Sequence, residues 1–241
     1  MSQPLKHIEE CILINGKRLN NIRYSDDTIL FADILEGLQT LVTQLWRISQ
    51  EYGLDFNIKK TKYMVISKKY ITSSQLLVDQ QQILQVPHYY YLGTTINDQW
   101  DHSVEIKQRI EKARSAFVRM SKIFKSHDLP LKTKICLLRC YVFTVLLYGV
   151  ESWTLTEASM GKLEAFDMWC YRRILTISWV SRVTNEVLRR MDKTCEIIST
   201  VKQRKLEYLG HIMRNDHRYN LLQLILQGKV YGKRGPGRKR I

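Results

Sequence analysis

The first hundred residues alternate short β-branched runs with turn residues, a pattern typical of hairpins. An apolar run over residues 11–14 is followed by Asn15-Gly16, which favours a two-residue turn, and then by a run over 19–24. A second turn at Ser25-Asp26-Asp27 leads into a run over 28–32. The pattern therefore predicts two adjacent aspartates at the tip of a β-hairpin.

Helical spacing follows directly after these strands. Apolar residues recur three, four and seven positions apart from residue 34 to residue 52, and Gly53 favours a helix end. Short apolar or aromatic runs predict further strands at 54–57, 63–67, 76–78 and 89–96. Residues 1–100 are thus expected to form an α+β fold with an antiparallel sheet.

Beyond residue 100 only helical spacing remains. Helices are expected at 104–124, 131–149, 157–175, 185–191, 196–214 and 219–227. Pro130 separates the first two. We expect one helical region over 101–155, a second over 156–228, and a flexible basic tail over 229–241, because residues 232–240 have no apolar side chain to pack.

Charge departs from the globular average more than composition does. The 241 residues are 44% apolar and 25% charged, but 38 lysines and arginines stand against 23 acids, giving +15. Residues 1–100 carry 10 of each sign, 101–200 carry 17 basic and 11 acidic, and 201–241 carry 11 and 2. This gradient points to a polyanionic partner, nucleic acid or an anionic membrane surface, with a solvated basic surface as the alternative.

The number and spacing of the cysteines indicate the redox state of the cellular compartment. They stand at Cys11, Cys136, Cys140, Cys170 and Cys195, without any Cys-x-x-Cys spacing. This usage is typical of free thiols in a reducing compartment, and residues 1–10 have no signal-like apolar run. We therefore expect an intracellular protein, nuclear or cytoplasmic and not secreted. Cys136 and Cys140 share a helix face in an apolar segment and are expected in the core.

Neither a membrane partner nor a zinc site is expected. The apolar stretch over 135–150 is too short to span a bilayer and contains Arg139. The nearest set of zinc ligands, Cys195, His211 and His217, does not have ligand spacing. A buried cysteine and surface histidines account for these residues.

Asp26 and Asp27 are the candidate metal ligands. Adjacent carboxylates repel each other unless a cation or a proton intervenes. Mg²⁺ is bound by one or two carboxylates together with substrate phosphates, and polymerases hold two such ions. Ordinary turn formation is the alternative, because aspartate is a common turn residue.

Several short segments match, in order, the blocks of one protein family. Tyr24-Ser25-Asp26-Asp27 matches a Tyr-x-Asp-Asp block, with Ser25 where Ala is common. Residues 53–61 match Gly-Leu-x-x-Asn-x-x-Lys-Thr, and Tyr91-Leu92-Gly93 matches a primer-grip block. Residues 147–153 and 209–214 are similar to segments farther downstream. Over nearly its whole length the chain resembles the reverse transcriptases of non-LTR, LINE-type retrotransposons.

The resemblance implies a metal role for Asp26 and Asp27. In that family the pair acts with a third carboxylate, on an earlier strand, to hold two Mg²⁺ or Mn²⁺ ions. We expect this carboxylate and the fingers to lie before residue 1. The chain would then be a carboxyl-terminal fragment with half a palm, a thumb and a post-polymerase region, catalytically incomplete alone unless another chain supplies the missing parts.

Two further roles follow from the resemblance. Lys60 matches the lysine near which the family places a proton donor for the pyrophosphate leaving group, and a solvated lysine is the alternative. Tyr91, Leu92 and Gly93 would position a primer terminus. The alternative for these three is a strand with core aromatics.

Basic side chains of the thumb and tail are the candidate nucleic-acid contacts. The first predicted thumb helix, largely away from its apolar stripe, carries Lys107, Arg109, Lys112, Arg114, Arg119, Lys122 and Lys125. The tail carries Lys233, Arg234, Arg238, Lys239 and Arg240, without the Arg-Pro order that would fit a minor groove. Both sets predict non-specific, salt-sensitive phosphate binding, with a solvated helix face as the alternative for the thumb.

The sequence therefore predicts a reverse-transcriptase fragment that binds RNA or DNA. Two alternatives stay open: a binding module with no chemistry, and a retroelement remnant with no selected function.

Overall fold

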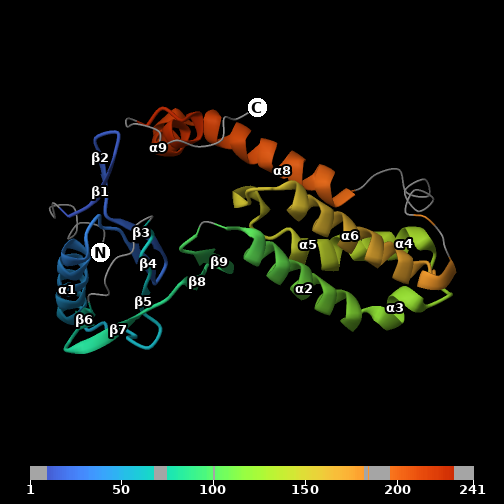
Figure 1. The fold of residues 1–241 in the computed structure, drawn as a ribbon, viewed down its shortest axis with the longest axis horizontal. Helices are drawn as coiled ribbons and strands as arrows, with labels where there is room; N and C mark the ends of the chain where they lie inside the picture. The colour runs from blue at the N-terminus through green and yellow to red at the C-terminus, as the bar shows by residue number, and fades with distance from the viewer. Residues whose placement is uncertain (1–9, 68–74, 100, 182–183, 185–195, 231–241) are drawn as a thin grey trace. The chain divides into compact units, whose positions relative to one another are not determined.

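The computed structural model describes residues 10–67, 75–99, 101–181, 184 and 196–230. The fold is α+β, as predicted, with small sheets followed by helices (Figure 1). Two compact units divide the chain: unit 1 is Met1–Tyr89 with Asn215–Ile241, and unit 2 is Tyr90–Arg214. The predicted helix at 185–191, Cys195 and most of the predicted tail lie outside the described residues.

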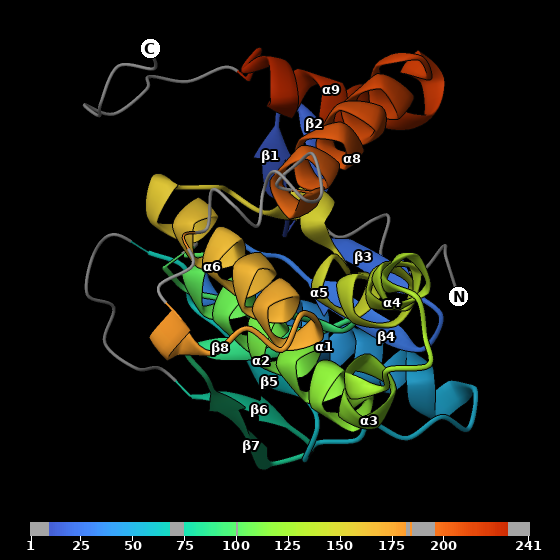
Figure 2. The ribbon, with the colours of Figure 1, turned by 90° about the vertical axis from the view of Figure 1, so that its right-hand side faces the viewer.

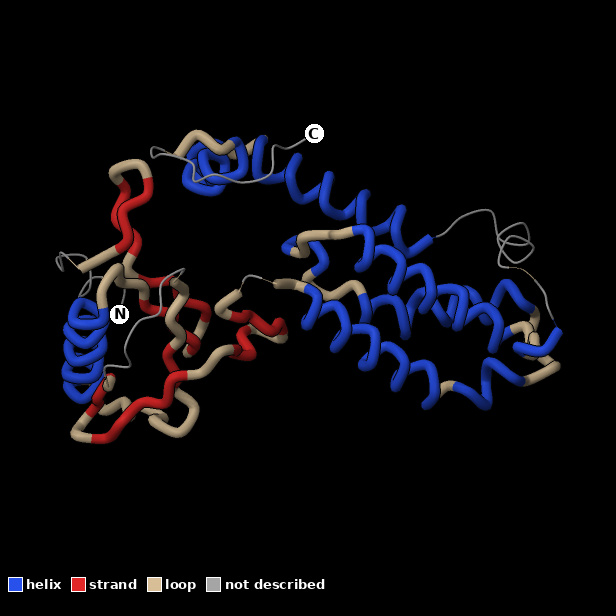
Figure 3. The backbone as a smooth tube through the Cα atoms, in the orientation of Figure 1, coloured by secondary structure: helices blue, strands red, loops and turns tan. Residues whose placement is uncertain are grey.

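Unit 1 begins with two antiparallel hairpins. β1 (Ile12–Ile14) and β2 (Lys17–Leu19) are joined by Asn15-Gly16 at φ 52° and 73°, which confirms the predicted turn. β3 (Asn21–Tyr24) and β4 (Asp27–Leu30) form the second hairpin (Figure 3). The predicted run over 19–24 is thus divided between two hairpins.

Helix α1 (Leu35–Glu51) confirms the predicted amphipathic helix. It ends where Gly53 takes φ 66°, with Gly53 N–H donating to Gln50 O at 3.0 Å and Leu54 N–H to Ser49 O at 2.8 Å. This pair of bonds is a Schellman motif, which satisfies two of the last carbonyls of the helix.

A small sheet packs on α1. β5 (Lys62–Tyr63), β6 (Leu76–Val78) and β7 (Gln81–Gln85) run in the order β5-β7-β6, with β5 parallel and β6 antiparallel to β7. Tyr63, Leu76, Val78 and Ile83 form a buried cluster with Val42 of α1. The predicted antiparallel sheet therefore includes one parallel pair.

Three strand predictions need correction. Residues 54–57 form no strand, because the chain leaves Gly53 in a left-handed conformation and then turns at Asn57, whose carbonyl accepts from Lys60 and Thr61. The strand predicted at 63–67 is only β5. The strand predicted at 89–96 is a hairpin of β8 (His88–Tyr91) and β9 (Thr94–Asn97), because the chain reverses at Leu92-Gly93.

Unit 2 is built mainly of helices. They are α2 (Ser103–Arg119), α3 (Ser121–Lys125), α4 (Leu131–Leu137), the π-helix η1 (Leu138–Phe143), α5 (Thr144–Leu146), the 3₁₀ turns η2 (Val150–Ser152) and η3 (Trp179–Ser181), α6 (Glu157–Ile174) and α8 (Glu196–Met213). The helix predicted at 104–124 breaks at Met120. Pro130 precedes α4 as predicted, and the π-helical turn interrupts the segment that follows.

Helix α9 (Asp216–Gln227) belongs to unit 1. The Asn15 side-chain amide donates to Lys229 O at 2.7 Å, just beyond α9. Lys17 Nζ donates to Asn220 Oδ1 at 2.6 Å within it. These bonds tie the first hairpin to residues more than two hundred positions later.

The core of unit 2 lies between α2, α6 and the α4–η1–α5 segment. Its fully buried side chains include Trp153, Phe124, Leu138 and Leu163. Within the described residues no helix is long and apolar enough to cross a bilayer.

The prediction that Cys136 and Cys140 pack in the core is wrong, since both thiols are exposed. The buried face of this segment runs through Lys134, Leu138 and Val142. Each cysteine stands two residues after one of these positions, which places it on the opposite side of the helix.

Candidate nucleic-acid interface

The Ser25-Asp26 hairpin consists of β3, β4 and the two turn residues between them. Tyr24 pairs with Asp27 at the end of the ladder, and Ser25 takes φ 54°. Asp26 therefore lies in the turn, while Asp27 is the first residue of β4. Both carboxylates are exposed, close to the predicted tip.

These two carboxylates do not complete a metal site by themselves. Within the described part of the chain, no group of three His, Cys, Asp or Glu side chains is placed to hold an ion. Mg²⁺ prefers six oxygen ligands, of which Asp26 and Asp27 could offer a part. The remaining ligands would have to come from outside this hairpin.

Lys60 lies in a turn organised by Asn57. Its backbone N–H donates to Asn57 O at 3.0 Å and to Asn57 Oδ1 at 3.1 Å. Tyr89 Oη donates to Lys60 O at 3.4 Å, and the Lys60 side chain is exposed. The backbone of Lys60 is thus fixed while its ammonium faces solvent.

The Leu92-Gly93 hairpin consists of β8, β9 and a two-residue turn with φ 46° at Leu92 and 83° at Gly93. Positive φ at a branched residue such as Leu92 is sterically unfavourable, and it persists only where the surroundings hold it. Tyr91 is half-buried and Leu92 is exposed. The residues matched to a primer grip therefore form a strained, partly exposed tip.

Side chains from helix α2 and from the loop between α5 and η2 hold this turn. Tyr148 Oη donates to Leu92 O at 2.9 Å, and the Arg109 guanidinium donates through Nη2 to Gly93 O. Arg109 Cζ also lies 4.6 Å from the centre of the Tyr148 ring. A Cβ on Gly93, which has φ 83°, would lie 3.0 Å from Tyr148 Cε1, so the tyrosine ring would have to shift to admit a side chain there.

A buried acid of α2, Glu105, holds both Arg109 and the second strand of the hairpin. Glu105, 1% exposed, accepts from Arg109 Nε at 2.7 Å through Oε1 and from Thr95 N–H at 2.8 Å through Oε2. Thr95 in turn donates from its hydroxyl to Gln108 Oε1 at 2.6 Å. One turn of α2 therefore fixes both the tip of the hairpin and its second strand.

The basic side chains predicted on the first thumb helix lie on α2 and, for Lys122 and Lys125, on α3. All are exposed except Arg109, which is 5% exposed and bonded to Glu105 and Gly93. Arg109 faces inward because it stands beside the apolar stripe of Ile106, Ile110 and Ala113. Lys112 Nζ lies 4.8 Å from the centre of the Tyr90 ring and donates to its hydroxyl at 3.3 Å. The exposed cations of the set are Lys107, Lys112, Arg114, Arg119, Lys122 and Lys125.

The first downstream segment noted in the sequence, residues 147–153, contacts helix α8 of unit 2, which also carries most of the second segment, 209–214. From α8, Lys205 Nζ donates to Glu151 O at 3.1 Å and to Trp153 O at 2.5 Å, and Arg204 donates to Leu147 O at 3.2 Å. Burial lowers the pKa of Lys205 more than the nearby Glu151 carboxylate raises it. These bonds attach α8 to the loop that carries Tyr148.

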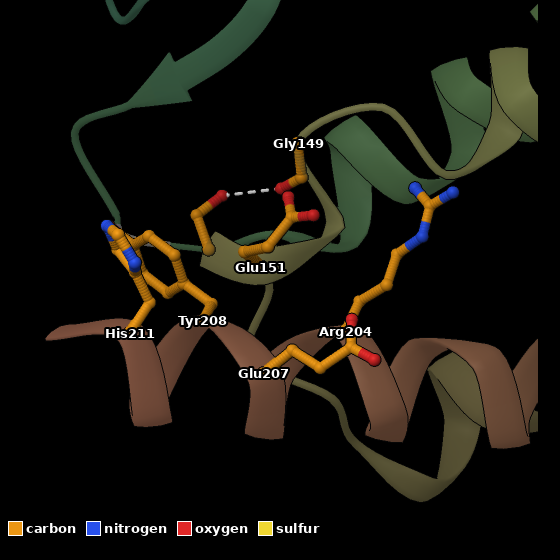
Figure 4. A pocket seen from close by; sticks show the side chains of 7 residues that line it. Gly149, Glu151, Arg204, Glu207, Tyr208 and His211 are labelled. Carbon is orange, nitrogen blue, oxygen red and sulfur yellow. Dashed lines mark hydrogen bonds between the residues drawn. The ribbon is translucent and has the colours of Figure 1, made fainter. Parts of the chain in front are cut away.

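An open cavity of about 610 Å³ lies between α8 and η2. In Figure 4, Arg204, Tyr208 and His211 extend from α8 toward η2, where Ser152 donates to Gly149 O at 2.9 Å. Glu151 and Glu207 also line the cavity. Because carboxylates stand beside Arg204, the lining does not favour an anionic ligand over a cationic one.

The candidate residues are distributed over both units. Asp26, Asp27 and Lys60 lie in unit 1, whereas Tyr91, Leu92, Gly93 and the α2 cations lie in unit 2. The tail residues Lys233, Arg234, Arg238, Lys239 and Arg240 lie outside the described part of the chain.

Sequence reasoning missed Glu105 and Tyr148 as supports of the hairpin. A signal existed for Glu105, which stands four residues before Arg109 on one helix and so can form an i,i+4 pair. Tyr148 contacts Leu92 across 56 residues. No local pattern could have shown that contact.

The chain is similar to a protein of transposon origin. An uncharacterized transposon-derived protein of Caenorhabditis elegans is 29% identical over 219 residues, covering 87% of this chain and 77% of its own length. No protein-family model matches, and no solved structure matches. The similarity supports an origin in a transposable element.

Proposed function

We propose that this chain is the nucleic-acid-binding portion of a non-LTR retrotransposon reverse transcriptase, and that alone it binds RNA or DNA without catalysing DNA synthesis. The Leu92-Gly93 hairpin carries the proposal, because a turn that matches a primer grip is held rigidly beside exposed cations. The transposon-derived relative supports the origin in a mobile element.

The hairpin and α2 suit contact with a sugar-phosphate backbone. Both turn carbonyls are engaged by Tyr148 and Arg109, so the tip has a fixed conformation without any ligand. Tyr90 and Lys112 next to it offer an exposed ring and an ammonium. Such groups hold nucleic acid by phosphate contact and base stacking without reading sequence.

The Ser25-Asp26 hairpin supplies the reason for inactivity. In a complete site the two aspartates would share Mg²⁺ or Mn²⁺ with a third carboxylate, and the ions would stabilise the attacking and leaving oxygens. Two exposed carboxylates on a turn hold such ions weakly. Lys60 would matter as a proton donor only in a completed site.

The binding half of the proposal is tested with an RNA–DNA hybrid oligonucleotide and the full chain. We expect affinity to fall steeply between about 50 and 200 mM salt, because each neutralised phosphate adds about 0.9 to the slope of log affinity against log salt. The triple variant Lys107→Gln, Lys112→Gln, Arg119→Gln should lose about 2.7 units of that slope if each cation contacts one phosphate.

A control with the same change in net charge is Arg47→Gln, Lys132→Gln, Lys202→Gln, whose parent side chains are exposed elsewhere. Equal slopes for the two triple variants would contradict binding through α2. Failure of the unchanged chain to bind the hybrid would contradict the proposed function.

The catalytic half is tested by primer extension on an RNA template with Mg²⁺ or Mn²⁺. The unchanged chain and Asp26→Ala should both give no extended product. Extension that disappears in Asp26→Ala would show that the lone chain is an active polymerase.

A further inference from the structure

An exposed aromatic-arginine cluster lies where α2 and α6 pack side by side (Figure 2). Arg114 of α2 and Arg173 of α6 place their guanidinium carbons 5.0 and 4.5 Å from the centre of the Trp169 ring. Both arginines are exposed, and Trp169 is half-buried. Two cations from different helices thus share one indole.

The indole is held in place by other aromatic rings. Phe117 of α2 meets Trp169 edge-on at 5.0 Å, and Phe166 stacks on it at 5.7 Å with an interplanar angle of 18°. Phe117 also stacks on Phe124 at 4.5 Å. Because these phenylalanines are buried, Trp169 is a fixed support for the two guanidinium groups.

The charges around this cluster are mainly positive. On α2, Lys107 and Glu111 precede Arg114 on one face, and Glu111 Oε1 lies 3.6 Å from Arg114 Nε. On α6, Arg172 adjoins Arg173, and Asp167 is fully buried. Glu111 is an exposed acid that would oppose an anion here.

We propose that the α2–α6 face centred on Trp169 binds the phosphate backbone of a nucleic acid through Arg114 and Arg173. The inference rests on the proposed nucleic-acid binding and extends its surface from α2 onto α6. A guanidinium stacked on a ring keeps its N–H fork free at the edge, where it can donate two parallel bonds to one phosphate. Both arginines are positioned before binding, which lowers the entropy lost on binding.

Nucleic acid fits this face better than a lipid surface does. Lys107 and Arg114 are both exposed and stand seven residues apart on one face of α2, about 10 Å along the helix at 1.5 Å per residue. A nucleic acid offers phosphates in a continuous row over such a distance, one per about 3.4 Å of duplex axis along each strand. The stacked indole also offers a ring near which a base could lie.

The test compares two double variants of the full chain with equal change in net charge. Arg114→Gln with Arg173→Gln removes the stacked cations, and Lys132→Gln with Lys202→Gln removes exposed cations of α4 and α8. With an RNA–DNA hybrid, the first pair should lower the salt slope by about 1.8 and the second by less than about 0.5.

Two single variants sharpen the result. Glu111→Gln removes the opposing acid and should tighten binding, so it gives a signal in the opposite direction. Trp169→Leu keeps both charges but removes their support, and it should weaken binding with little change in slope. Circular dichroism shows whether Trp169→Leu is folded. Glu111→Gln changes an exposed position, so it tests binding at the α2–α6 face even if Trp169→Leu unfolds.

The outcomes separate this inference from the function it rests on. If the unchanged chain binds the hybrid and both double variants have equal slopes, the α2–α6 face is refuted while the proposed function stands. If the unchanged chain does not bind, both are refuted. Arginine-dependent binding to phosphatidylserine vesicles, without arginine-dependent binding to the hybrid, would also overturn the inference.

Discussion

Two hairpins with two-residue turns carry the most informative motifs of this chain, and they are supported very differently. At the Ser25-Asp26 hairpin the turn is closed by the ladder pair of Tyr24 and Asp27, and both aspartates are exposed. The Leu92-Gly93 hairpin is tied through its carbonyls to Arg109 and Tyr148, with Glu105 buried behind it.

The two turns differ in how many side chains from other parts of the chain hold their backbone conformation. A positive φ at Ser25 occurs in a small residue on an open turn, whereas a positive φ at Leu92 is maintained by a network of side chains. Preorganisation of this kind favours binding, because the tip need not be ordered by the ligand. Three substitutions test the comparison, in order of expected effect.

The largest effect is expected from Glu105→Gln. It leaves the buried Arg109 without its charged partner, and breaking such a pair costs about 3–5 kcal/mol. Glu111→Gln is the matched control, because its exposed pair with Arg114 should contribute less than about 1 kcal/mol. Urea unfolding followed by tryptophan fluorescence measures both, and equal losses would contradict a structural role for the buried pair.

Gly93→Ala should destabilise more than Gly16→Ala. Both glycines have positive φ, which costs alanine about 1–2 kcal/mol at either position. A Cβ at Gly93 also meets Tyr148 at 3.0 Å, whereas nothing lies within 4 Å at Gly16. We expect an additional loss of about 1–2 kcal/mol at Gly93 from this overpacking. A smaller loss at Gly93 than at Gly16 would show that Tyr148 does not hold the turn closely.

Tyr148→Phe should have the smallest effect. It removes one hydrogen bond to Leu92 O, worth about 0.5–1.5 kcal/mol, and leaves the ring over Arg109. Tyr24→Phe, at the exposed position before the other turn, should change the free energy of unfolding by less than about 0.5 kcal/mol. Thermal unfolding of the two variants distinguishes the hairpins if only Tyr148→Phe lowers the midpoint.

Local signals in the sequence identified several elements correctly. Asn15-Gly16 predicted its hairpin because both residues tolerate positive φ, and Gly53 predicted the end of α1 for the same reason. The turn at Leu92-Gly93 was missed, because an apolar leucine stands at a position where a polar or small residue is usual. Its conformation is set by tertiary contacts.

The candidate site shows the same limit. The sequence identified the α2 cations but did not set Arg109 apart, although it stands beside the apolar stripe of Ile106 and Ala113. The groups that it contacts, Gly93 O and the Tyr148 ring, come from distant parts of the chain. The sequence also gave no sign of the cluster at Trp169, because Arg114 and Arg173 come together only when α2 packs on α6. Pairing between distant helices is not encoded in any local period.

Hydroxyl-radical footprinting of the full chain with an RNA–DNA hybrid tests the central claim most directly. Tyr90 and Tyr24 are both exposed and stand near the two turns, so each reports on its own hairpin. We predict that the hybrid protects Tyr90 and Trp169 and leaves Tyr24 as reactive as in the free chain. Protection of Tyr24 with Tyr90 and Trp169 unchanged would place the nucleic acid on the wrong hairpin and contradict the account.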